Sequence, residues 1–383
     1  MSNVLKIPCS IIRGGTSKGI FFRSENLPED HEKREKVILR AFGSPDLRQI
    51  DGLAGANSLT SKVAIISQSK DEVGVIDYTF GQVSITSKVV DWTGNCGNLS
   101  SAVGLFAVGE GLVPVTEPAT KVVVFNTNTQ KKIHINMPAL NGEITTEGDL
   151  LIPGVPFTGA PFLVEFEDPS GSVTKKLLPT GRPLDSIEIS GLGSFHYSLV
   201  DAANPVVFLL AEELGLDGIE LPEAVEKMTD KLEKIEAIRS RICVEMGLVA
   251  TPSEATRSSP AIPKIGFVSR VRSFVTPDGK NVGQEEIDLV ARLASMQKMH
   301  RAYMVTGAIC TAVASQIEGT VVWEVLRESA RRTGKVRIGQ PYGPMEVNLT
   351  INRDSGFKVE KAGVWRTARR ILDGCVYVPE SQL

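Results

Sequence analysis

The first half of the chain alternates short runs of β-branched residues with turn residues. Runs rich in valine, isoleucine and threonine, bounded by Gly, Asn, Asp and Ser, are typical of strands. Four such runs stand out: "KVAIIS", "VGVIDYTFGQVSIT", "KVVVFNT" and "IHINMPA". We therefore predict that this half is rich in β-strands.

Helical patterns are clearest in three other segments. In Glu29–Gly43, "EDHEKREKVILRAFG", acidic residues open the segment, and Gly43 followed by Pro45 ends it. The segment Glu223–Met246 has apolar residues at helical spacing and Glu/Lys pairs three to four residues apart, which favours a surface helix. Gln284–Met299 has a similar pattern, so we predict a helix there as well.

Two further helical segments, Leu99–Val108 and Ala302–Ile317, contain no charged residue. A helix that is apolar or small on every side is buried on every side. One such segment lies in each half of the chain, and each is flanked by predicted strands. This arrangement indicates a duplicated unit in which a sheet wraps around a central helix.

The length of 383 residues favours two domains. A Pro- and Gly-rich segment, Leu177–Phe195, separates the two halves and is the best candidate for a linker. We therefore predict an N-terminal domain over residues 1–185 and a C-terminal domain over residues 186–383, with a last strand that can return to the first domain.

Composition limits the class of partner. With 42 basic and 45 acidic residues the formal net charge is -3, so we expect a small solute rather than nucleic acid or an anionic membrane. Five scattered cysteines without a C-x-x-C pair argue against a disulfide framework and a structural zinc site. The sequence has neither a signal-peptide pattern nor an apolar segment of about 18 residues. We expect a soluble cytoplasmic protein, with a homo-oligomeric state left open.

Three Gly-rich polar loops lie in the first half: Arg13–Gly19, "RGGTSKG"; Asp51–Lys62, "DGLAGANSLTSK"; and Gly94–Asn98, "GNCGN". Glycine lets the backbone approach a ligand, and Ser, Thr and Asn add neutral donors, so such loops suit carboxylates or phosphates. Each loop alone can be an ordinary tight turn, but three together favour an anion site. The absence of a P-loop and of a G-x-G-x-x-G motif after a strand disfavours nucleotides. The candidate substrate-binding residues in these loops are Thr16, Ser17, Asn57, Ser61, Asn95, Gly97 and Asn98.

Two residues in these loops are candidate catalytic groups. At the start of a buried helix, the thiolate of Cys96 would be stabilised by unpaired N–H groups and by the helix dipole. Lys62 stands where a polar loop meets an apolar strand, and a lysine there can be desolvated, which lowers its pKa. The alternatives are an inert buried thiol and a solvated lysine at the start of a strand.

The second half offers fewer candidates. Cys310 could oppose Cys96 and give a two-base racemase, but it lies well inside its predicted helix, which favours an inert core position. His300 precedes that helix and can face the same cleft, so it is a substrate-binding candidate. No set of His, Asp, Glu and Cys has metal-ligand spacing, so we predict no metal.

Five segments together resemble a known family over nearly the whole chain: "IPCSIIRGGTSKGIFF", "DGLAGANSLTSKVAII", "DYTFGQVSI", "GNCGNLSSAVGLFA" and "RTARRILDG". They are similar to the 2-methylaconitate cis-trans isomerases, methylitaconate delta-isomerases and 4-oxalomesaconate tautomerases. The turn "NCGN" also resembles the catalytic-cysteine turn of diaminopimelate epimerases. The resemblance implies an α+β, diaminopimelate epimerase-like fold, with two similar domains, each a β-barrel-like sheet around a central helix, and a site in the cleft between them.

The resemblance also implies roles for single residues. The lysine and cysteine implicated in the family fall on Lys62 and Cys96, and no cofactor is implied. Late in the chain, "RIGQPYG" (Arg337–Gly343) takes the place of a familial R-I-G-H-P-S-G turn, which makes Arg337 a substrate-binding candidate. The loop "GLAGANSLTSK" is more similar to the methylitaconate isomerase and tautomerase branches.

We therefore expect a cofactor-independent isomerase of small unsaturated di- or tricarboxylates, such as methylitaconate, methylaconitate or aconitate. It would move or rotate a C=C bond by allylic proton transfer, and the sequence leaves open which of Lys62 and Cys96 takes the proton. The alternatives are a keto–enol tautomerase of the 4-oxalomesaconate type, a two-base amino-acid epimerase, and a carboxylate-binding protein without catalysis.

Overall fold

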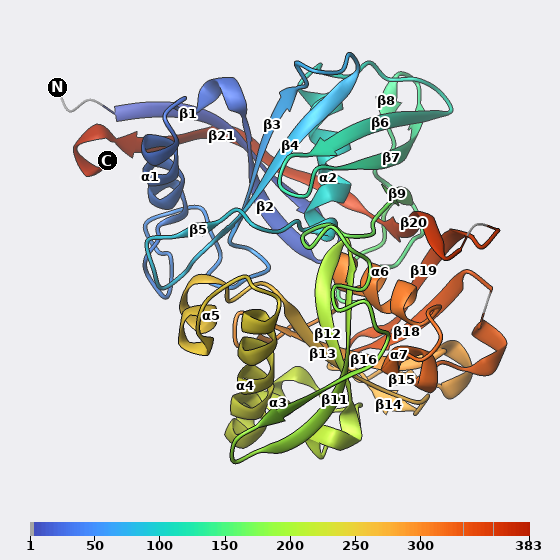
Figure 1. Cartoon of the computed structure of the whole chain (residues 1–383). Coiled ribbons are helices and arrows are strands. Elements are labelled where there is room, and N and C mark those ends of the chain that lie inside the picture. Colours follow the sequence, from blue (N-terminus) through green and yellow to red (C-terminus); the bar gives the residue numbers. More distant parts are fainter. Residues whose placement is uncertain (1–3, 332, 355) are drawn as a thin grey trace. The chain divides into compact units, whose positions relative to one another are not determined.

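The computed structural model describes residues 4–331, 333–354 and 356–383. The chain forms two compact units, Met1–Glu165 with Trp365–Leu383, and Phe166–Val364 (Figure 1). The chain passes from one unit to the other within β9 (Phe162–Glu167) and within β20 (Lys358–Arg366). The sequence-based division placed the first boundary later, at residue 185; in the structure the first unit ends before that position and includes the last strand.

The first unit is built on a mixed sheet. Its main strands are, in the order of pairing, β21 (Ala368–Pro379), β1 (Val4–Gly14), β2 (Ser17–Arg23), β3 (Lys62–Gln68), β4 (Val75–Val83), β6 (Ala119–Asn126) and β7 (Lys131–Leu140). The pairs β2/β3 and β4/β6 are parallel, and the other pairs in this series are antiparallel. Two short strands are also present: β5 (Val90–Asp91) pairs antiparallel with β4, and β8 (Glu143–Ile144) pairs antiparallel with β7. The four runs predicted as strands are confirmed as β3, β4, β6 and β7.

Helix α2 (Gly97–Gly109) is the central helix of the first unit, and its residues Gly97–Ala107 are all buried. It contacts β1, β2, β3, β6, β7 and β21, and Figure 1 shows it enclosed by these strands. The prediction of a buried, uncharged helix here is confirmed. On the outside lies the predicted helix α1 (His31–Phe42), where the Asp30 side chain accepts the Lys33 N–H and left-handed Gly43 ends the helix.

The second unit repeats this plan. Its main strands are, in the order of pairing, β10 (Asp185–Ile189), β11 (Gly193–Ala202), β12 (Asn204–Leu210), β13 (Lys264–Ser269), β16 (Leu289–Ser295), β18 (Lys335–Gln340), β19 (Gly343–Asn352) and β20. The pairs β12/β13 and β16/β18 are parallel, and the rest of the series is antiparallel. From β1 to β7 and from β11 to β19, parallel and antiparallel pairs therefore alternate in the same order.

The central helix of the second unit is α6 (Val305–Ala314), and every one of its residues is buried. It packs against β11, β12, β18 and β19. It stands between β17 (Lys298–Met299) and β18, as α2 stands between β5 and β6. The duplicated sheet-and-helix unit inferred from the two uncharged segments is present.

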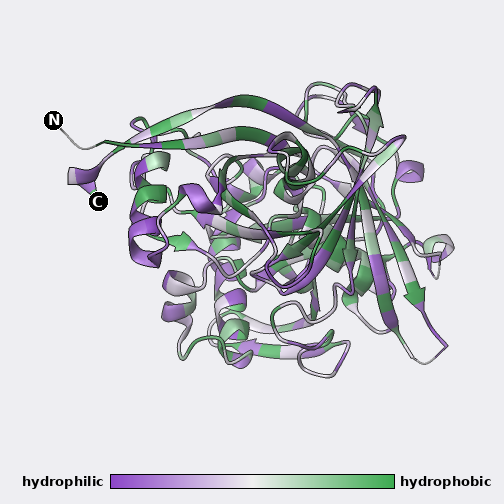
Figure 2. Ribbon diagram, turned by 90° about the horizontal axis from the view of Figure 1, so that it is seen from above, coloured by the Kyte–Doolittle hydropathy of each residue, from purple (hydrophilic) through white to green (hydrophobic). Residues whose placement is uncertain are grey.

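Other elements complete the two units. The remaining helices are α3 (Pro222–Lys227), α4 (Thr229–Glu245), α5 (Pro252–Ser258) and α7 (Val321–Val325), and a small separate hairpin is formed by β14 (Phe274–Val275) and β15 (Asn281–Val282). Short 3-10 turns lie at Ser24–Asn26, Ala211–Leu214, Gln284–Glu286, Glu328–Ala330 and Glu380–Gln382. Figure 2 shows hydrophobic and hydrophilic positions alternating along several strands, as expected where one face is buried and the other meets solvent. No helix in the described part of the chain is both long and apolar enough to span a bilayer.

Two predictions from helical periodicity need correction. The segment Glu223–Met246 is not one helix, because the chain breaks at Met228 between α3 and α4. The helix predicted over Gln284–Met299 is wrong: this segment forms a 3-10 turn followed by β16 and β17.

The second error has a physical cause. Strand β16 pairs on both edges, with β13 and β18, and its residues Leu289–Ala294 are all buried, so it lacks the alternation that marks a half-exposed strand. Its turn into β17 uses Met296 and Gln297 with positive φ angles of 55° and 57°, where the sequence shows neither Gly nor Asn as a signal.

The turn between β1 and β2 packs closely against the first turn of α2, and this contact can be tested. A Cβ added at Gly14 would lie 2.4 Å from the main-chain oxygen of Asn98. We expect Gly14→Ala to lower the free energy of unfolding by about 1–3 kcal/mol because the backbone must shift. The matched control is Gly374→Ala in β21, whose added Cβ meets only Leu372 Cδ2 at 3.6 Å, an ordinary contact. Denaturant unfolding of both variants measures the difference, and equal losses would contradict the prediction.

Candidate functional site

Cys96 is the N-cap residue of α2. Its sulfur accepts the N–H of Leu99 at 3.5 Å and lies 3.8 Å from Oγ of Ser17. The side chain is half-buried, and it is positioned where unpaired N–H groups of a buried helix converge. The predicted place of Cys96 at the start of the helix is confirmed.

Lys62 is the first residue of β3 and is only 7% exposed. It stands directly opposite Gln82 in the antiparallel pair β3/β4, and its Nζ donates a hydrogen bond to Gln82 Oε1 at 2.5 Å. Nζ also lies 5.4 Å from the centre of the Phe80 ring. Burial lowers the pKa of Lys62, and the negative charge of a Cys96 thiolate opposes this shift with a smaller effect. The amine therefore loses its proton more readily than a solvated lysine.

Two of the predicted loops meet at the N-terminus of α2. The main-chain N–H of Thr16 donates to Asn98 Oδ1 at 3.4 Å, and the hydroxyl of Ser17 faces the Cys96 sulfur. The Ser100 hydroxyl contacts the main-chain oxygen of Cys96 and Asn95 Oδ1, at 3.0 and 3.3 Å. The structure thus brings Thr16, Ser17, Asn95, Gly97 and Asn98 together with Cys96.

Glycine is required in this contact. A Cβ at Gly15, which has a φ of +47°, would lie 2.2 Å from Asn98 Oδ1 and 3.0 Å from Cδ of Arg366. Only a residue without a side chain lets the β1–β2 turn lie this close to the helix. The Gly-rich composition of the first loop therefore serves the close approach of backbone to helix.

The predicted loop Asp51–Lys62 contributes in a different way. Ser61 is fully buried, and its hydroxyl accepts a hydrogen bond from Gln49 Nε2 at 2.8 Å. Asn57 is exposed and stabilises its own turn, because its Oδ1 accepts the Leu59 N–H at 2.9 Å and its Nδ2 donates to the Gly55 oxygen at 3.1 Å. The roles of Ser61 and Asn57 in binding substrate stay predictions.

Two residues of β4 belong to this site although the sequence reasoning did not select them. Gln82 contacts Lys62, and Tyr78 is fully buried with a pKa raised well above its usual value, first by burial and then by the charge of Cys96. The nearby Ser100 hydroxyl lowers this pKa by less, and the Tyr78 hydroxyl has no hydrogen-bond partner of good geometry among the described residues. The Thr16 hydroxyl is likewise buried without a partner in the described part of the chain. Both hydroxyls can serve a ligand.

Arg337 and His300 belong to the second unit. The Arg337 guanidinium binds Asp288 with two nitrogens, at 2.7 and 3.2 Å, and donates to the main-chain oxygen of Glu285 at 2.7 Å. Hydrogen bonds to Asp288 raise the pKa of Arg337, and this carboxylate already neutralises it. The main-chain N–H of His300 donates to the oxygen of Leu293. Their roles as substrate contacts stay predictions, and the ion pair counts against Arg337.

Cys310 lies in the middle of α6, fully buried, and its thiol donates to the main-chain oxygen of Val200 at 3.1 Å. Burial raises the pKa of Cys310 far above the usual range. The residue of α6 in the place that Cys96 has in α2, the N-cap, is Met304, which cannot exchange a proton. The second unit therefore has no thiol at the position equivalent to Cys96.

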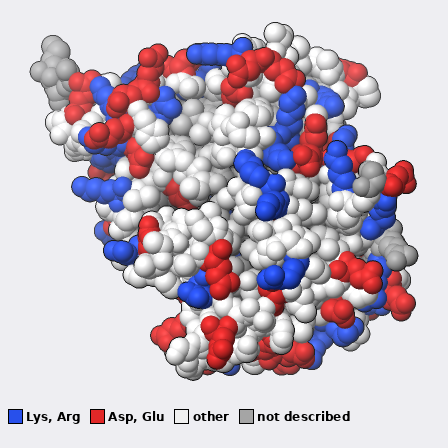
Figure 3. Space-filling model, viewed as in Figure 1, with Lys and Arg blue, Asp and Glu red and all other residues white. Residues whose placement is uncertain are grey.

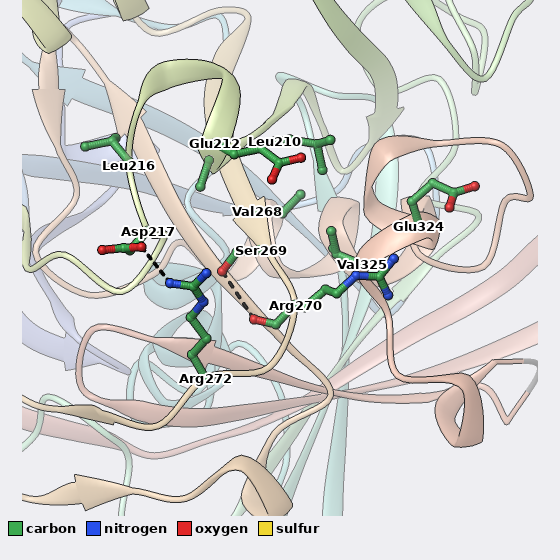
Figure 4. A pocket seen from close by; sticks show the side chains of 11 residues that line it. Leu210, Glu212, Leu216, Asp217, Val268, Ser269, Arg270, Arg272, Glu324 and Val325 are labelled. Atoms are coloured by element: carbon green, nitrogen blue, oxygen red, sulfur yellow. Dashed lines mark hydrogen bonds and ion pairs between the residues drawn. The ribbon is translucent and has the colours of Figure 1, made fainter.

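A surface cavity of about 300 Å³ lies in the second unit, where the parallel strands β12 and β13 end (Figure 4). Its floor includes the buried Val268 and Val325, and its rim includes Arg272, paired with Asp217 at 2.6 Å. None of the predicted site residues lines it.

Two observations concern charged groups outside the site. On the face shown in Figure 3, acidic and basic side chains are interspersed. Among the described residues no group of three or more His, Cys, Asp and Glu side chains is arranged to hold a metal ion.

Comparison with known proteins adds to this geometry. A family model described as "PrpF protein" matches residues 4–379. The chain is 47% identical over 384 residues to the 3-methylitaconate isomerase of Eubacterium barkeri, with 100% of both chains covered. It is 37% identical to the 2-methyl-aconitate isomerase of Shewanella oneidensis, covering 98% of each chain. Identity to the 4-oxalomesaconate tautomerase of Pseudomonas putida is 34%, covering 97% of this chain and 96% of the relative.

Solved structures confirm the predicted fold. The crystal structure of a methylitaconate-delta-isomerase matches with a TM-score of 0.82 and 46% identity, covering 100% of this chain and 97% of the other. A hydroxyproline epimerase from Agrobacterium vitis matches with a TM-score of 0.57 and 12% identity, over 99% of this chain and 95% of the other, which shows a shared fold alone. The α+β, diaminopimelate epimerase-like class is therefore confirmed.

The two central-helix cysteines give a matched pair of variants. Cys96→Ser keeps the size of the group but replaces a thiol with a far less acidic hydroxyl, so we expect turnover to fall about 100- to 10,000-fold with little loss of stability. Cys310→Ala should cost about 1–2 kcal/mol of stability, as a small core truncation does, and leave the rate nearly unchanged. Steady-state kinetics and denaturant unfolding on both variants separate the two effects. Near-normal turnover in Cys96→Ser would remove Cys96 from the mechanism.

Proposed function

Because this chain belongs to the PrpF family, we propose that it is a cofactor-independent isomerase that moves or rotates the C=C bond of a small unsaturated di- or tricarboxylate. That the chain is an isomerase follows from its identity, over its full length, to proteins of that class. The proposal adds the substrate class, the absence of a cofactor and the residues that transfer the proton.

One observation carries the proposal. Lys62 is buried, its nitrogen is paired with no carboxylate among the described residues, and it lies close enough to the N-cap cysteine of α2 for their charges to interact. Burial favours the uncharged amine of Lys62, whereas a negative charge on Cys96 would favour the ammonium with a smaller effect. A neutral amine and a thiol held in one site can exchange a proton through the substrate.

The proposed reaction has two proton transfers. The Lys62 lone pair takes an allylic proton, the C–H electron pair forms a new C=C bond, and the charge spreads into the carboxylate-bearing end of the substrate. The Cys96 thiol then gives its proton to the far carbon, which completes the double-bond shift, and the ammonium of Lys62 returns a proton to the thiolate. Rotation before the second transfer gives cis–trans exchange. The N–H and O–H donors at the start of α2, with the Thr16 and Tyr78 hydroxyls, can stabilise the growing negative charge.

The relatives favour a substrate of the methylitaconate type. A 3-methylitaconate isomerase is 47% identical to this chain, against 34% for the oxalomesaconate tautomerase. The tautomerase relative favours 4-oxalomesaconate as a second candidate, because keto–enol exchange uses the same removal and return of a proton. A two-base epimerase is disfavoured, since Met304 occupies the place of a second thiol.

Three expectations from the sequence stay predictions: a location in the cytoplasm, a homo-oligomeric assembly, and partners limited to a small carboxylate. The described cysteines are all free thiols, which is compatible with a reducing compartment.

Deuterium exchange tests the proton transfer. If a side chain exchanges the allylic proton with solvent before it is returned, isomerisation of 3-methylitaconate in deuterium oxide should place deuterium on the product carbon. Lys62→Ala should lose both isomerisation and exchange if Lys62 is the base, and mass spectrometry of the acids after partial conversion measures both.

A matched control exists in the second unit. Lys264 is also the first residue of a strand and also buried, so Lys264→Ala removes an equivalent amine from the repeated frame. We expect this variant to keep both isomerisation and exchange. Undiminished turnover in Lys62→Ala would exclude Lys62 from the reaction, and exchange without isomerisation would make it the group that returns the proton.

A further inference from the structure

We propose that Gln82 is a positioning residue: its side-chain oxygen holds the Lys62 amine in place as an uncharged base and leaves the nitrogen lone pair for the substrate. The inference rests on the proposed function, because it gives Gln82 a part in the proton transfer by Lys62. It starts from the hydrogen bond of 2.5 Å between Lys62 Nζ and Gln82 Oε1, which joins two buried side chains directly opposite each other on β3 and β4.

The orientation of the Gln82 amide is fixed by its own nitrogen. Nε2 donates to the main-chain oxygen of Ser61 at 2.9 Å and to that of Ser58 at 3.3 Å. Carbonyl oxygens only accept hydrogen bonds, so the amide nitrogen must face them. The reversed amide would set oxygen against two oxygens and an N–H group against the lysine. Oε1 is therefore the atom that faces Lys62.

A neutral acceptor suits an amine that must give up its proton. An uncharged amine has two N–H groups and one lone pair. Gln82 accepts a hydrogen bond from one of these N–H groups without adding a negative charge. A carboxylate in the same place would favour the ammonium form instead. Burial already lowers the pKa of Lys62, and the amide leaves that effect intact.

The two carbonyl oxygens that hold Gln82 belong to a fixed loop. Gln49, which is 1% exposed, donates from Nε2 to the hydroxyls of Ser61 and Ser44, each at 2.8 Å. Its Oε1 accepts the main-chain N–H of Ala56 at 2.8 Å. This network fixes the loop, the loop fixes Gln82, and Gln82 fixes the amine, so the geometry at Lys62 is set before a substrate arrives.

The decisive experiment is a direct titration of Lys62 in the full chain with Gln82→Glu. Lysines labelled with carbon-13 at Cε are followed by NMR against pH, and the Lys62 signal is assigned by its loss in Lys62→Met. We expect the pKa of Lys62 to rise by at least about one pH unit, because the new carboxylate stabilises the ammonium. The rising limb of the pH profile of kcat should move up by the same amount, with a smaller change in KM.

The control for adding a buried carboxylate is Gln49→Glu, which places the same charge in the same network but not on the Lys62 nitrogen. It should lower stability while moving the pKa of Lys62 much less. Gln82→Met serves as a second variant if Gln82→Glu does not fold. It removes the acceptor without adding a charge, and should lower kcat at every pH by about tenfold or more, whereas KM changes little.

The outcomes separate this inference from the proposed function. An unchanged Lys62 pKa in Gln82→Glu, an equal rise in Gln49→Glu, or full turnover in Gln82→Met would each overturn the role of Gln82. A raised Lys62 pKa with an unmoved pH profile of kcat would support the control of Lys62 by Gln82 and overturn Lys62 as the base in the proposed function.

Discussion

A helix buried on every side must satisfy its first N–H groups within the protein, and the site of this enzyme depends on that constraint. In α2 the sulfur of Cys96 accepts the N–H of Leu99, so the N-cap of the helix is also the group proposed to transfer a proton. Close packing of the β1–β2 turn at Gly14 and Gly15 then brings polar loop residues to the same helix end. The proposed proton transfer therefore lies where the fold already requires polar groups to converge.

Duplication of the fold does not duplicate the site. Both units alternate parallel and antiparallel strand pairs in the same order around an uncharged helix. The equivalent strands β3 and β13 each begin with a buried lysine, Lys62 and Lys264. Only the first unit has a thiol at the N-cap, because the second has Met304 there and keeps Cys310 inside the helix. The two units therefore share a strand-and-helix frame but differ in the residues at the start of the central helix, where the proposed reaction takes place.

The sequence predicted the features that depend on local pattern. Strands followed from β-branched runs, the central helices from missing charge, and Cys96 and Lys62 from their place at the junction of loop and core.

Gln82 was not selected because its role depends on the register of β3 against β4; only that pairing sets it opposite Lys62. The alternation Ile76, Tyr78, Phe80, Gln82 along β4 did carry a signal, since two polar residues share the inward face. The ion pair that occupies Arg337 joins residues far apart in sequence and was likewise not predictable from local pattern.

A buried lysine with a neutral partner makes the protein's stability and its reactivity depend on the same proton. The pKa of Lys62 is lower in the folded chain than in the unfolded chain, so between these two values the unfolded chain binds the proton and the folded chain does not. The free energy of unfolding therefore rises with pH across that interval. The cost of burying the Lys62 ammonium is fully present only below the pKa that Lys62 has in the folded chain. The neutral amine that the proposed reaction needs forms over the lower part of the same range. A carboxylate partner would remove that cost and, with it, the base, which is why a glutamine rather than a glutamate suits the position opposite Lys62.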